Sequence, residues 1–393
     1  MKVKEYIVQE LKKGYMGFVR LASSKAVAQG TSDEIAYLMS FPGNDQGFLK
    51  TLNKAFPERK VVIYYTEACR LEAEGLSDVG FVIESLAASV DFFKKVIPRL
   101  ASSALILCDN YFAFLGELTL PKTTQVIQLW HANGAVKRFG WGDPKTSQRT
   151  LEDQQRFQKV YNRFDRIVVS SDRMAQIFKA SFHLAEKRML KIGSPRIDNY
   201  FKEDYREKAI AKFQQQFPEA RDKKVILYAP TYRDAPLEEP VWWKWLRRLD
   251  EETVLIYKRH PHLEAQIATS ELTDNPRVMT DMRGLNLQEL LISVDCLIGD
   301  YTSIPFEYSL ANPEGQLVFY CPDIANYHKS VGLQEDFVKW SNEACATNLE
   351  ELLELINRQE SVSLDTINEV WNQYNDGQAT ERLLSYLKEE ALG

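Results

Sequence analysis

The chain has 393 residues, of which 45% are hydrophobic and 26% charged, and it is too long for one small core. Its net charge of −6 at pH 7 argues against broad nucleic-acid binding, so we expect no nucleic acid among its partners. Five scattered cysteines without CxxC spacing argue against a zinc site or a disulfide framework, and no apolar run is long enough to span a bilayer.

Residues 1–25 predict a basic amphipathic helix. Six lysines and arginines outnumber two glutamates in this segment, and apolar side chains recur between them. Such a helix can lie on an anionic membrane surface or pack its apolar side on the first domain, and the sequence leaves both interpretations open. The segment has no signal-peptide core, so we expect the protein in the cytoplasm.

Short apolar runs alternate with helix-like stretches between residues 26 and 202. Their Val and Ile content is typical of strands buried on both faces, and the alternation predicts a parallel sheet with right-handed crossovers. The predicted strands are Glu34–Phe41, Lys60–Tyr65, Gly80–Glu84, Ala104–Cys108, Gln125–Trp130 and Arg166–Ser170. The predicted helices are Gln46–Phe56, Ser89–Leu100 and Thr150–Phe164.

A second alternating series follows the charged helix Glu203–Phe217, so we place a domain boundary near residue 200. The first doubly wound, Rossmann-type domain spans 26–202, and the second spans 203–393 with terminal helices. In such α/β domains ligands bind beyond the carboxyl ends of the strands, and here the two domains would face a central cleft. The predicted strands of the second domain are Lys224–Ala229, Val254–Lys258, Arg277–Thr280, Asp295–Gly299 and Gln316–Tyr320, with a helix at Gly284–Val294.

His131 directly follows one of the predicted strands of the first domain. The loop behind it contains Gly134, Lys137 and Arg138, which add backbone freedom and positive charge. A histidine of near-neutral pKa at a cleft edge can accept a proton from an attacking hydroxyl. The alternative is a loop histidine that is hydrogen-bonded to the backbone.

A basic cluster lies at the end of a strand in the second domain. Lys258, Arg259, His260 and His262 place four cationic or protonatable side chains there. Such a cluster suits the stabilisation of charge on a phosphate and on a leaving nucleotide. A solvated basic turn is the alternative.

The segment 296–310 predicts a strand end, a polar turn and a helix start. Asp300, Thr302 and Ser303 lie in the turn, and Pro305 suits the first turn of the new helix. Free N–H groups and two hydroxyls at the positive end of a helix form a favourable binding site for a phosphate. An ordinary connection capped by Ser303 is the alternative.

Two further segments carry weaker candidates for phosphate binding. Arg196 and Asp198 close the first half of the chain, and Thr231 and Arg233 follow the first strand of the second half. Together they supply arginines and a hydroxyl on both sides of the predicted cleft. The sequence has no P-loop, GxGxxG or GxSxG motif, no HExxH pair and no carboxylate cluster suited to a metal.

The order of these motifs resembles the CDP-glycerol glycerophosphotransferase family of teichoic acid biosynthesis. The resemblance implies a GT-B-like α/β fold, no cofactor and no metal. It also implies transfer of polyol phosphate from CDP-glycerol or CDP-ribitol, with release of CMP. The implied acceptor is a saccharide linked to a polyprenyl-diphosphate lipid, or a short polyol phosphate chain, and the implied location is peripheral, on the inner face of the cell membrane. The matching segments are Leu129-Trp130-His131, Gly193-Ser194-Pro195-Arg196-Ile197-Asp198, Leu227-Tyr228-Ala229-Pro230-Thr231-Tyr232-Arg233, Lys258-Arg259-His260-Pro261 and Gly299-Asp300-Tyr301-Thr302-Ser303.

The same resemblance implies roles for the motif residues. His131 matches the general base, and His260 matches the histidine that contacts the donor diphosphate. Thr302 and Ser303 match the hydroxyl pair that binds donor phosphates. The other donor phosphate candidates are Lys258, Arg259 and Asp300, and the weaker ones are Arg196, Asp198, Thr231, Arg233 and Glu307.

The chain departs from the family pattern in the loop after the motif histidine, where it has Ala132 and Asn133 in place of Gly-Thr. We expect this loop to approach the acceptor, so the departure bears on the identity of the acceptor. The chain also has Gly299, Thr302 and Glu307 where Thr, Ser and Asp are commoner.

Two other functions remain open. A nucleotide-sugar glycosyltransferase on the same two-domain fold would consume a sugar nucleotide. A non-catalytic, polymer-binding relative would bind substrate without releasing CMP, and the retained motif histidines argue against it. The size of the chain favours a priming or short-chain transferase over a long-chain polymerase.

Overall fold

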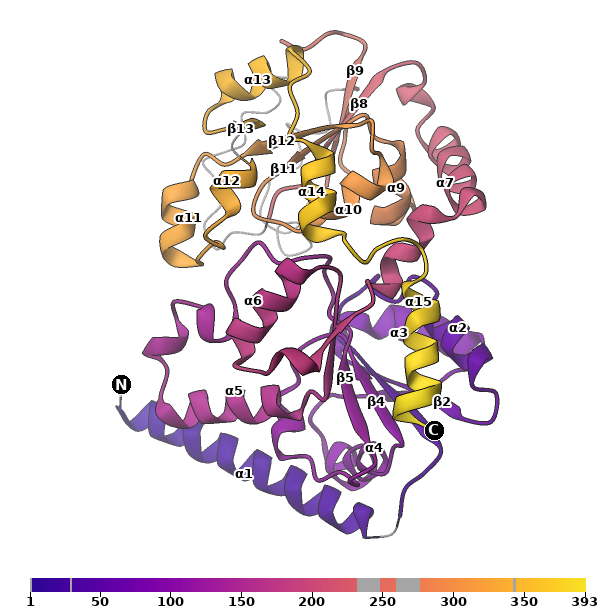
Figure 1. Cartoon of the computed structure of the whole chain (residues 1–393), viewed down its shortest axis with the longest axis vertical. Helices are drawn as coiled ribbons and strands as arrows, with labels where there is room; N and C mark the ends of the chain where they lie inside the picture. Colours follow the sequence, from indigo (N-terminus) through magenta and orange to yellow (C-terminus); the bar gives the residue numbers. More distant parts are fainter. Residues whose placement is uncertain (1, 29, 232–247, 259–275, 342–343) are drawn as a thin grey trace.

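Two parallel sheets lie one above the other in the structure, a computed structural model that describes all residues except 1, 29, 232–247, 259–275 and 342–343 (Figure 1). The first sheet has the strand order β3-β2-β1-β4-β5-β6-β7, and the second has the order β10-β9-β8-β11-β12-β13. This topology confirms the predicted fold class, two doubly wound α/β units in a GT-B-like arrangement.

The strands of the two sheets confirm the predicted series and add a short edge strand to each sheet. The first sheet contains β1 (Glu34–Met39), β2 (Lys60–Tyr65), β3 (Val82–Ser85), β4 (Leu105–Cys108), β5 (Gln125–Gln128), β6 (Arg166–Val169) and β7 (Met189–Lys191). The second contains β8 (Lys224–Tyr228), β9 (Thr253–Tyr257), β10 (Val278–Met279), β11 (Cys296–Gly299), β12 (Gln316–Tyr320) and β13 (Cys345–Ala346). The additional strands are β7 and β13, which are too short to show an apolar pattern of their own.

Helices cover both faces of the first sheet. Neighbouring residues of its strands belong to different cores, as Ile35 and Ala36 of β1 illustrate, because side chains alternate between the faces of a sheet. One core includes residues of α1 (Lys2–Val27), α4 (Ile97–Ala101), α5 (Leu151–Arg163) and α6 (Asp172–Phe182), and the other includes residues of α2 (Phe48–Ala55) and α3 (Arg70–Asp78).

The second sheet is enclosed in the same way. Its larger core contains residues of α7 (Glu203–Gln216), α9 (Leu287–Ser293), α10 (Ile304–Ala311), α11 (Ile324–Ser330), α12 (Phe337–Ser341) and α14 (Leu364–Trp371). Its smaller core, on the other face of the strands, contains residues of α13 (Leu349–Asn357). The predicted helix at Gly284–Val294 is thus confirmed as α9, with a capping box formed by Asn286 and Glu289.

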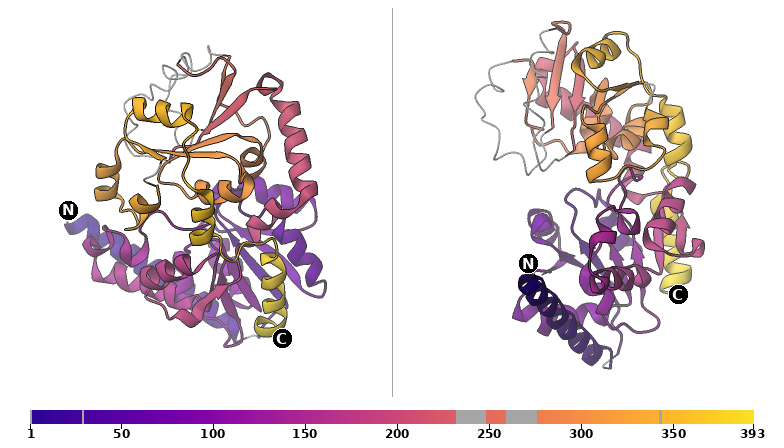
Figure 2. Two further views of the ribbon diagram at one scale, coloured as in Figure 1. Left: turned by 45° about the horizontal axis from the view of Figure 1, so that its top comes forward. Right: turned by 90° about the vertical axis from the view of Figure 1, so that its left-hand side faces the viewer.

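Helix α1 packs one face on the first domain and leaves another exposed. Val19, Ser23 and Ala26 are buried, and Val19 belongs to the core beneath the sheet. None of the described helices is long and apolar enough to cross a membrane. The right-hand view of Figure 2 shows α1 and the C-terminal helix on opposite sides of the first domain.

The C-terminal helix α15 (Ala379–Tyr386) returns to the first domain (Figure 1). Its Leu383, together with Leu387, lies in the first-domain core that also contains α2 and α3. The predicted second domain, 203–393, includes this helix. The structure corrects that division, because these leucines bury their side chains against the first sheet and the chain crosses between the domains twice.

A buried amide network joins the two domains. Asn133 of the loop after β5 donates from Nδ2 to Asn372 Oδ1 at 2.6 Å, and its own Oδ1 accepts from Asn375 Nδ2 at 3.0 Å. Asn372 also donates to the main-chain oxygen of Phe306 in α10, at 2.9 Å. Each of these buried amide groups thus finds a protein partner in place of water, as polar groups in a buried interface must.

Gly134, the next residue, is enclosed by aromatic rings from the second domain. Its φ is +87°, and a Cβ at this position would lie 2.5 Å from Phe306 Cδ2 and 2.9 Å from Trp371 Cε3. Only glycine combines this backbone conformation with so close an approach.

We therefore expect Gly134→Ala to lower the free energy of unfolding by at least about 2 kcal/mol, through backbone strain and overpacking. Urea denaturation followed by circular dichroism measures this change. The matched control is Gly14→Ala, in α1 with nothing within 4 Å of the added Cβ, where we expect a gain of up to about 1 kcal/mol. Equal stability of the two variants would contradict the packing described here.

Candidate active site

The candidate residues that the structure describes gather where the carboxyl ends of the two sheets meet. His131 lies just beyond β5, and Thr231 and Lys258 lie just beyond β8 and β9. The turn from Asp300 to Ser303 joins β11 to α10. Asn133, two residues from His131, is bonded to α10 through the amide network, so the first-domain loop and the second-domain turn are parts of one site.

His131 is enclosed by two aromatic rings. Its imidazole stacks on Phe41 at a centroid distance of 3.8 Å and an angle of 7°, and on Trp130 at 4.4 Å and 29°. Its Nδ1 lies 2.9 Å from the main-chain oxygen of Asp109. Because a carbonyl oxygen only accepts, Nδ1 carries the hydrogen, and Nε2 of the neutral ring keeps its lone pair.

The charge state of His131 suits a base. Burial lowers the pKa of His131 to about 4, and the nearby Arg196 cation lowers it further, while the bond to Asp109 opposes both effects. The imidazole is therefore neutral at pH 7. The two interpretations of this histidine are compatible, since the backbone bond at Nδ1 leaves Nε2 able to accept a proton.

Asp109, at the end of β4, is a buried residue of the site that the motifs do not include. Its carboxylate accepts three hydrogen bonds: from Ser40 N at 2.8 Å, from Phe41 N at 2.9 Å and from Ser40 Oγ at 2.8 Å. Burial raises the pKa of Asp109 to about 6. In the sequence, Asp109 is distinguished only by its position directly after a predicted strand. That position alone does not predict a contact with His131.

Arg196, near the end of the first domain, and Glu307 of the second domain form a buried ion pair. Arg196 lies in the 3₁₀ helix Pro195–Phe201, and Glu307 lies in α10 and also accepts from Tyr200 Oη at 3.1 Å. Arg196 Nε is buried without a hydrogen-bond partner among the described residues. Glu307 therefore fixes one side of this arginine, and its Nε is enclosed with no partner among the described residues.

Asp300 joins the ends of β8 and β11. Its carboxylate accepts from Thr231 N at 2.9 Å and 3.0 Å, and from Thr231 Oγ1 at 2.7 Å. These bonds hold the two strand ends together, so both residues shape the turn on which Thr302 and Ser303 lie.

The hydroxyls of the turn are placed at the start of α10. Thr302 Oγ1 accepts from Ile304 N at 3.4 Å. Ser303 is the N-cap residue of α10, but its side chain makes no capping hydrogen bond. The interpretation of Ser303 as an ordinary side-chain cap is therefore wrong, and its hydroxyl lies at the positive end of the helix dipole.

The remaining sequence candidates separate into three groups. Lys258 is half-buried beyond β9, and burial lowers its pKa. Asp198 accepts from Ala379 N at 3.1 Å and from Thr380 N at 2.7 Å, so its carboxylate caps α15. Arg233, Arg259, His260 and His262 lie outside the described residues. Within the described part of the chain, no group of three or more His, Cys, Asp or Glu side chains is placed to hold a metal ion.

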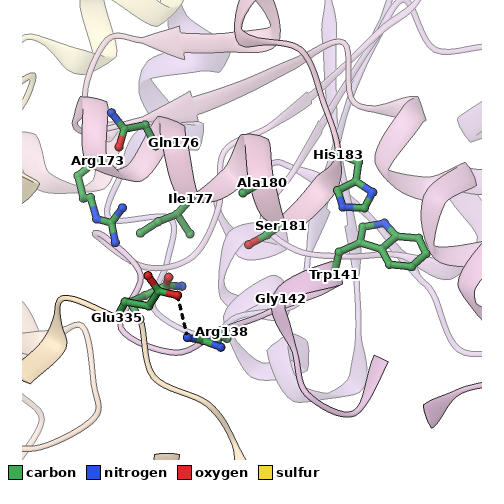
Figure 3. A pocket seen from close by; sticks show the side chains of 11 residues that line it. Arg138, Trp141, Gly142, Arg173, Gln176, Ile177, Ala180, Ser181, His183 and Glu335 are labelled. Atoms are coloured by element: carbon green, nitrogen blue, oxygen red, sulfur yellow. Dashed lines mark hydrogen bonds and ion pairs between the residues drawn. The ribbon is translucent and has the colours of Figure 1, made fainter. Parts of the chain in front are cut away.

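The loop after His131 also lines a cavity of about 360 Å³. Figure 3 shows Trp141 and His183 stacked at one end of it and Arg138, Arg173 and Glu335 at the other. The rings of Trp141 and His183 are 4.8 Å apart at 4°, and Arg138 lies 3.5 Å from Glu335 across the domain boundary. The cavity thus combines an aromatic surface with two arginines, and His131 is not among its lining residues.

Comparisons with known proteins agree with these motifs. The family model described as CDP-Glycerol:Poly(glycerophosphate) glycerophosphotransferase matches residues 84–389. A teichoic acid glycerol-phosphate primase of Bacillus subtilis (strain 168) is 32% identical over 360 residues, which cover 90% of this chain and 91% of that protein. A teichoic acid ribitol-phosphate primase of Bacillus spizizenii (strain ATCC 23059 / NRRL B-14472 / W23) is 28% identical and covers 74% of this chain and 76% of its own. The solved wall teichoic acid polymerase TagF superposes with a TM-score of 0.74 over 100% of this chain and 98% of its own, at 17% identity, a similarity of fold.

The lowered pKa of His131 predicts a pH-dependent stability. The unfolded chain binds a proton at this histidine below about pH 6.5, whereas the folded protein binds it only near pH 4, so acid favours unfolding in that window. Between pH 7 and 4.5 the wild type should lose up to about 3 kcal/mol more than His131→Gln. Urea denaturation of both proteins at the two pH values measures the difference, and parallel losses would contradict a buried neutral imidazole.

Proposed function

Because this chain belongs to the CDP-glycerol:poly(glycerophosphate) glycerophosphotransferase family, we propose that it transfers glycerol phosphate from CDP-glycerol to a lipid-linked saccharide and thereby primes a teichoic acid. It is an enzyme of CDP-polyol phosphate transfer in teichoic acid synthesis. The choice of glycerol over ribitol is supported by the glycerol-phosphate primases, which match 90–96% of this chain, against 74% for the ribitol-phosphate primase.

The observation that carries the proposed mechanism is the contact of His131 Nδ1 with the main-chain oxygen of Asp109, because it leaves Nε2 of the imidazole as the proton acceptor. Its Nε2 takes the proton from an acceptor hydroxyl while that oxygen attacks the phosphorus that bears the glycerol unit. A new P–O bond to the acceptor forms as the bond to the CMP phosphate breaks, and CMP leaves with the electron pair. The reaction is mostly positioning and electrostatics, so the side chains around the phosphates matter as much as the base.

Residues around the turn from Asp300 to Ser303 are suited to the donor phosphates. Ser303 has a hydroxyl at the N-terminus of α10 that makes no capping bond, Thr302 lies beside it, and Arg196 Nε is a buried donor without a partner among the described residues. Lys258 adds a cation beyond β9. In the family pattern His260 and Arg259 complete this set. The cavity behind the His131 loop supports a place for the acceptor on the first domain.

Helix α1 supplies a surface for the membrane that would carry the lipid-linked acceptor. Ile7, Leu11, Phe18 and Leu21 recur at helical spacing and are more than half exposed, on a face other than the one that packs on the domain. Lys25 continues the same stripe toward the end of α1. Exposed apolar residues beside basic residues are typical of helices that lie in an anionic interface, which supports a peripheral location on the inner face of the cell membrane.

The test of the reaction is CMP release from CDP-glycerol and, separately, from CDP-ribitol, each with a lipid-linked disaccharide. We expect acceptor-dependent release from CDP-glycerol and a roughly 10²–10⁴-fold lower rate for His131→Ala, with donor binding retained. The matched control is His328→Ala, which removes an exposed histidine of α11. Release from CDP-ribitol alone would correct the polyol, whereas consumption of a sugar nucleotide would favour a glycosyltransferase. Near-full turnover of His131→Ala would exclude His131 as the base.

The test of the membrane surface is flotation with vesicles rich in phosphatidylglycerol. The double variant Leu11→Glu, Phe18→Glu should bind at least about tenfold more weakly, because it removes two large apolar side chains and adds two negative charges. The control Leu71→Glu changes a side chain that is 84% exposed on α3, and it should bind as the wild type does. Unchanged binding of the double variant would exclude α1 as the contact.

A further inference from the structure

We propose that Asp109 positions the base of the reaction. It holds the His131 imidazole in the tautomer whose Nε2 can accept a proton, and it holds the ring inside an aromatic enclosure formed by Phe41 and Trp130. The proposal rests on the proposed function of His131 and adds a residue outside the matching motifs. Asp109 acts through its own main chain and through Phe41, so it is a positioning residue.

The first contact fixes the tautomer. The main-chain oxygen of Asp109 lies 2.9 Å from His131 Nδ1. If the hydrogen moved to Nε2, the lone pair of Nδ1 would face the lone pairs of this oxygen at the same distance, and the two would repel. The carbonyl therefore selects the form of the neutral ring in which Nε2 is the acceptor.

The second contact fixes the enclosure. Both carboxylate oxygens of Asp109 accept hydrogen bonds, from the main-chain N–H groups of Ser40 and Phe41 and from the Ser40 hydroxyl. These bonds hold the Phe41 ring 3.8 Å from the imidazole. An alanine in place of Asp109 leaves both N–H groups and the Ser40 hydroxyl without this acceptor, so the position of Phe41 depends on the carboxylate oxygens.

Asp109 is protonated before His131 as the pH falls. Burial raises the pKa of Asp109 to about 6, well above that of His131. The titratable groups around it are Tyr37, Cys69, Glu72 and Cys108, whose pKa values are all raised by burial. The protonated carboxyl keeps Oδ2 as the acceptor for the two main-chain N–H groups and can donate from Oδ1 to the Ser40 hydroxyl, so the enclosure and the neutral imidazole persist below pH 6.

The test follows the imidazole directly, by NMR of protein labelled with ¹⁵N-histidine and assigned with His131→Gln. In the wild type we expect the Nδ1-protonated form of His131 to persist to about pH 5. In Asp109→Ala the midpoint for protonation of His131 should move upward by at least 1 pH unit, because Phe41 is no longer held against the ring and the ring becomes hydrated. This measurement needs no substrate, so it tests the positioning even if the proposed reaction is wrong.

Two variants keep the result interpretable. Asp165→Ala is the matched control, since Asp165 Oδ2 accepts from Val126 N at 2.8 Å, at the opposite end of β5 from His131. It should leave the His131 midpoint unchanged. Ser40→Ala removes one of the three donors to Asp109, and it should move the midpoint in the same direction by a smaller amount, even if Asp109→Ala folds poorly.

Kinetics of CMP release complete the test. For Asp109→Ala we expect kcat to fall about 10²-fold with the KM for CDP-glycerol changed less than threefold. An unchanged His131 midpoint in both Asp109→Ala and Ser40→Ala would overturn the proposal. So would an equal shift in Asp165→Ala, since it would show a general loss of stability. A shifted midpoint in a protein that releases no CMP would support the positioning and refute the proposed function.

Discussion

The amide network of Asn133, Asn372 and Asn375 is the constraint on which the rest of the site depends. Each of its bonds is formed in the absence of water, so a shift of either domain leaves a buried polar group unpaired, at a cost of about 1–3 kcal/mol. The network holds the loop of His131 against the main chain of α10. His131 and the turn from Asp300 to Ser303 belong to different domains, and these buried bonds hold the two segments in one arrangement.

The charge states of the side chains in the site are determined more by burial than by pairing with opposite charges. The imidazole of His131 stays neutral because aromatic rings replace its water. Arg196 would otherwise be an uncompensated buried cation, and Glu307 neutralises it without reaching the base. The neutral His131 imidazole can therefore accept a proton, while the nearby Arg196 can donate hydrogen bonds to negatively charged oxygens. Phosphate transfer requires both kinds of group.

Local patterns predicted most of the fold, and the motif order predicted where His131 and the turn at Asp300 lie. Contacts between distant segments were not predictable. Asp198 looked like a phosphate ligand from its motif, but its carboxylate caps a helix 181 residues away. Asn133 was expected near the acceptor and lies in the buried interface instead. Asp109 gave no signal beyond its place after a strand, since its role depends on the loop of Phe41, 68 residues earlier.

The two crossings between the domains lie against each other, and each contains a glycine with positive φ. Gly193 of the first crossing leaves no room for a Cβ beside Tyr374 O, at 2.2 Å, and Gly377 of the second leaves none beside Phe201 Cβ, at 2.7 Å. Because each glycine is packed against the other crossing, neither connection can shift without displacing the other. The two crossings therefore form one packed unit at the junction of the domains.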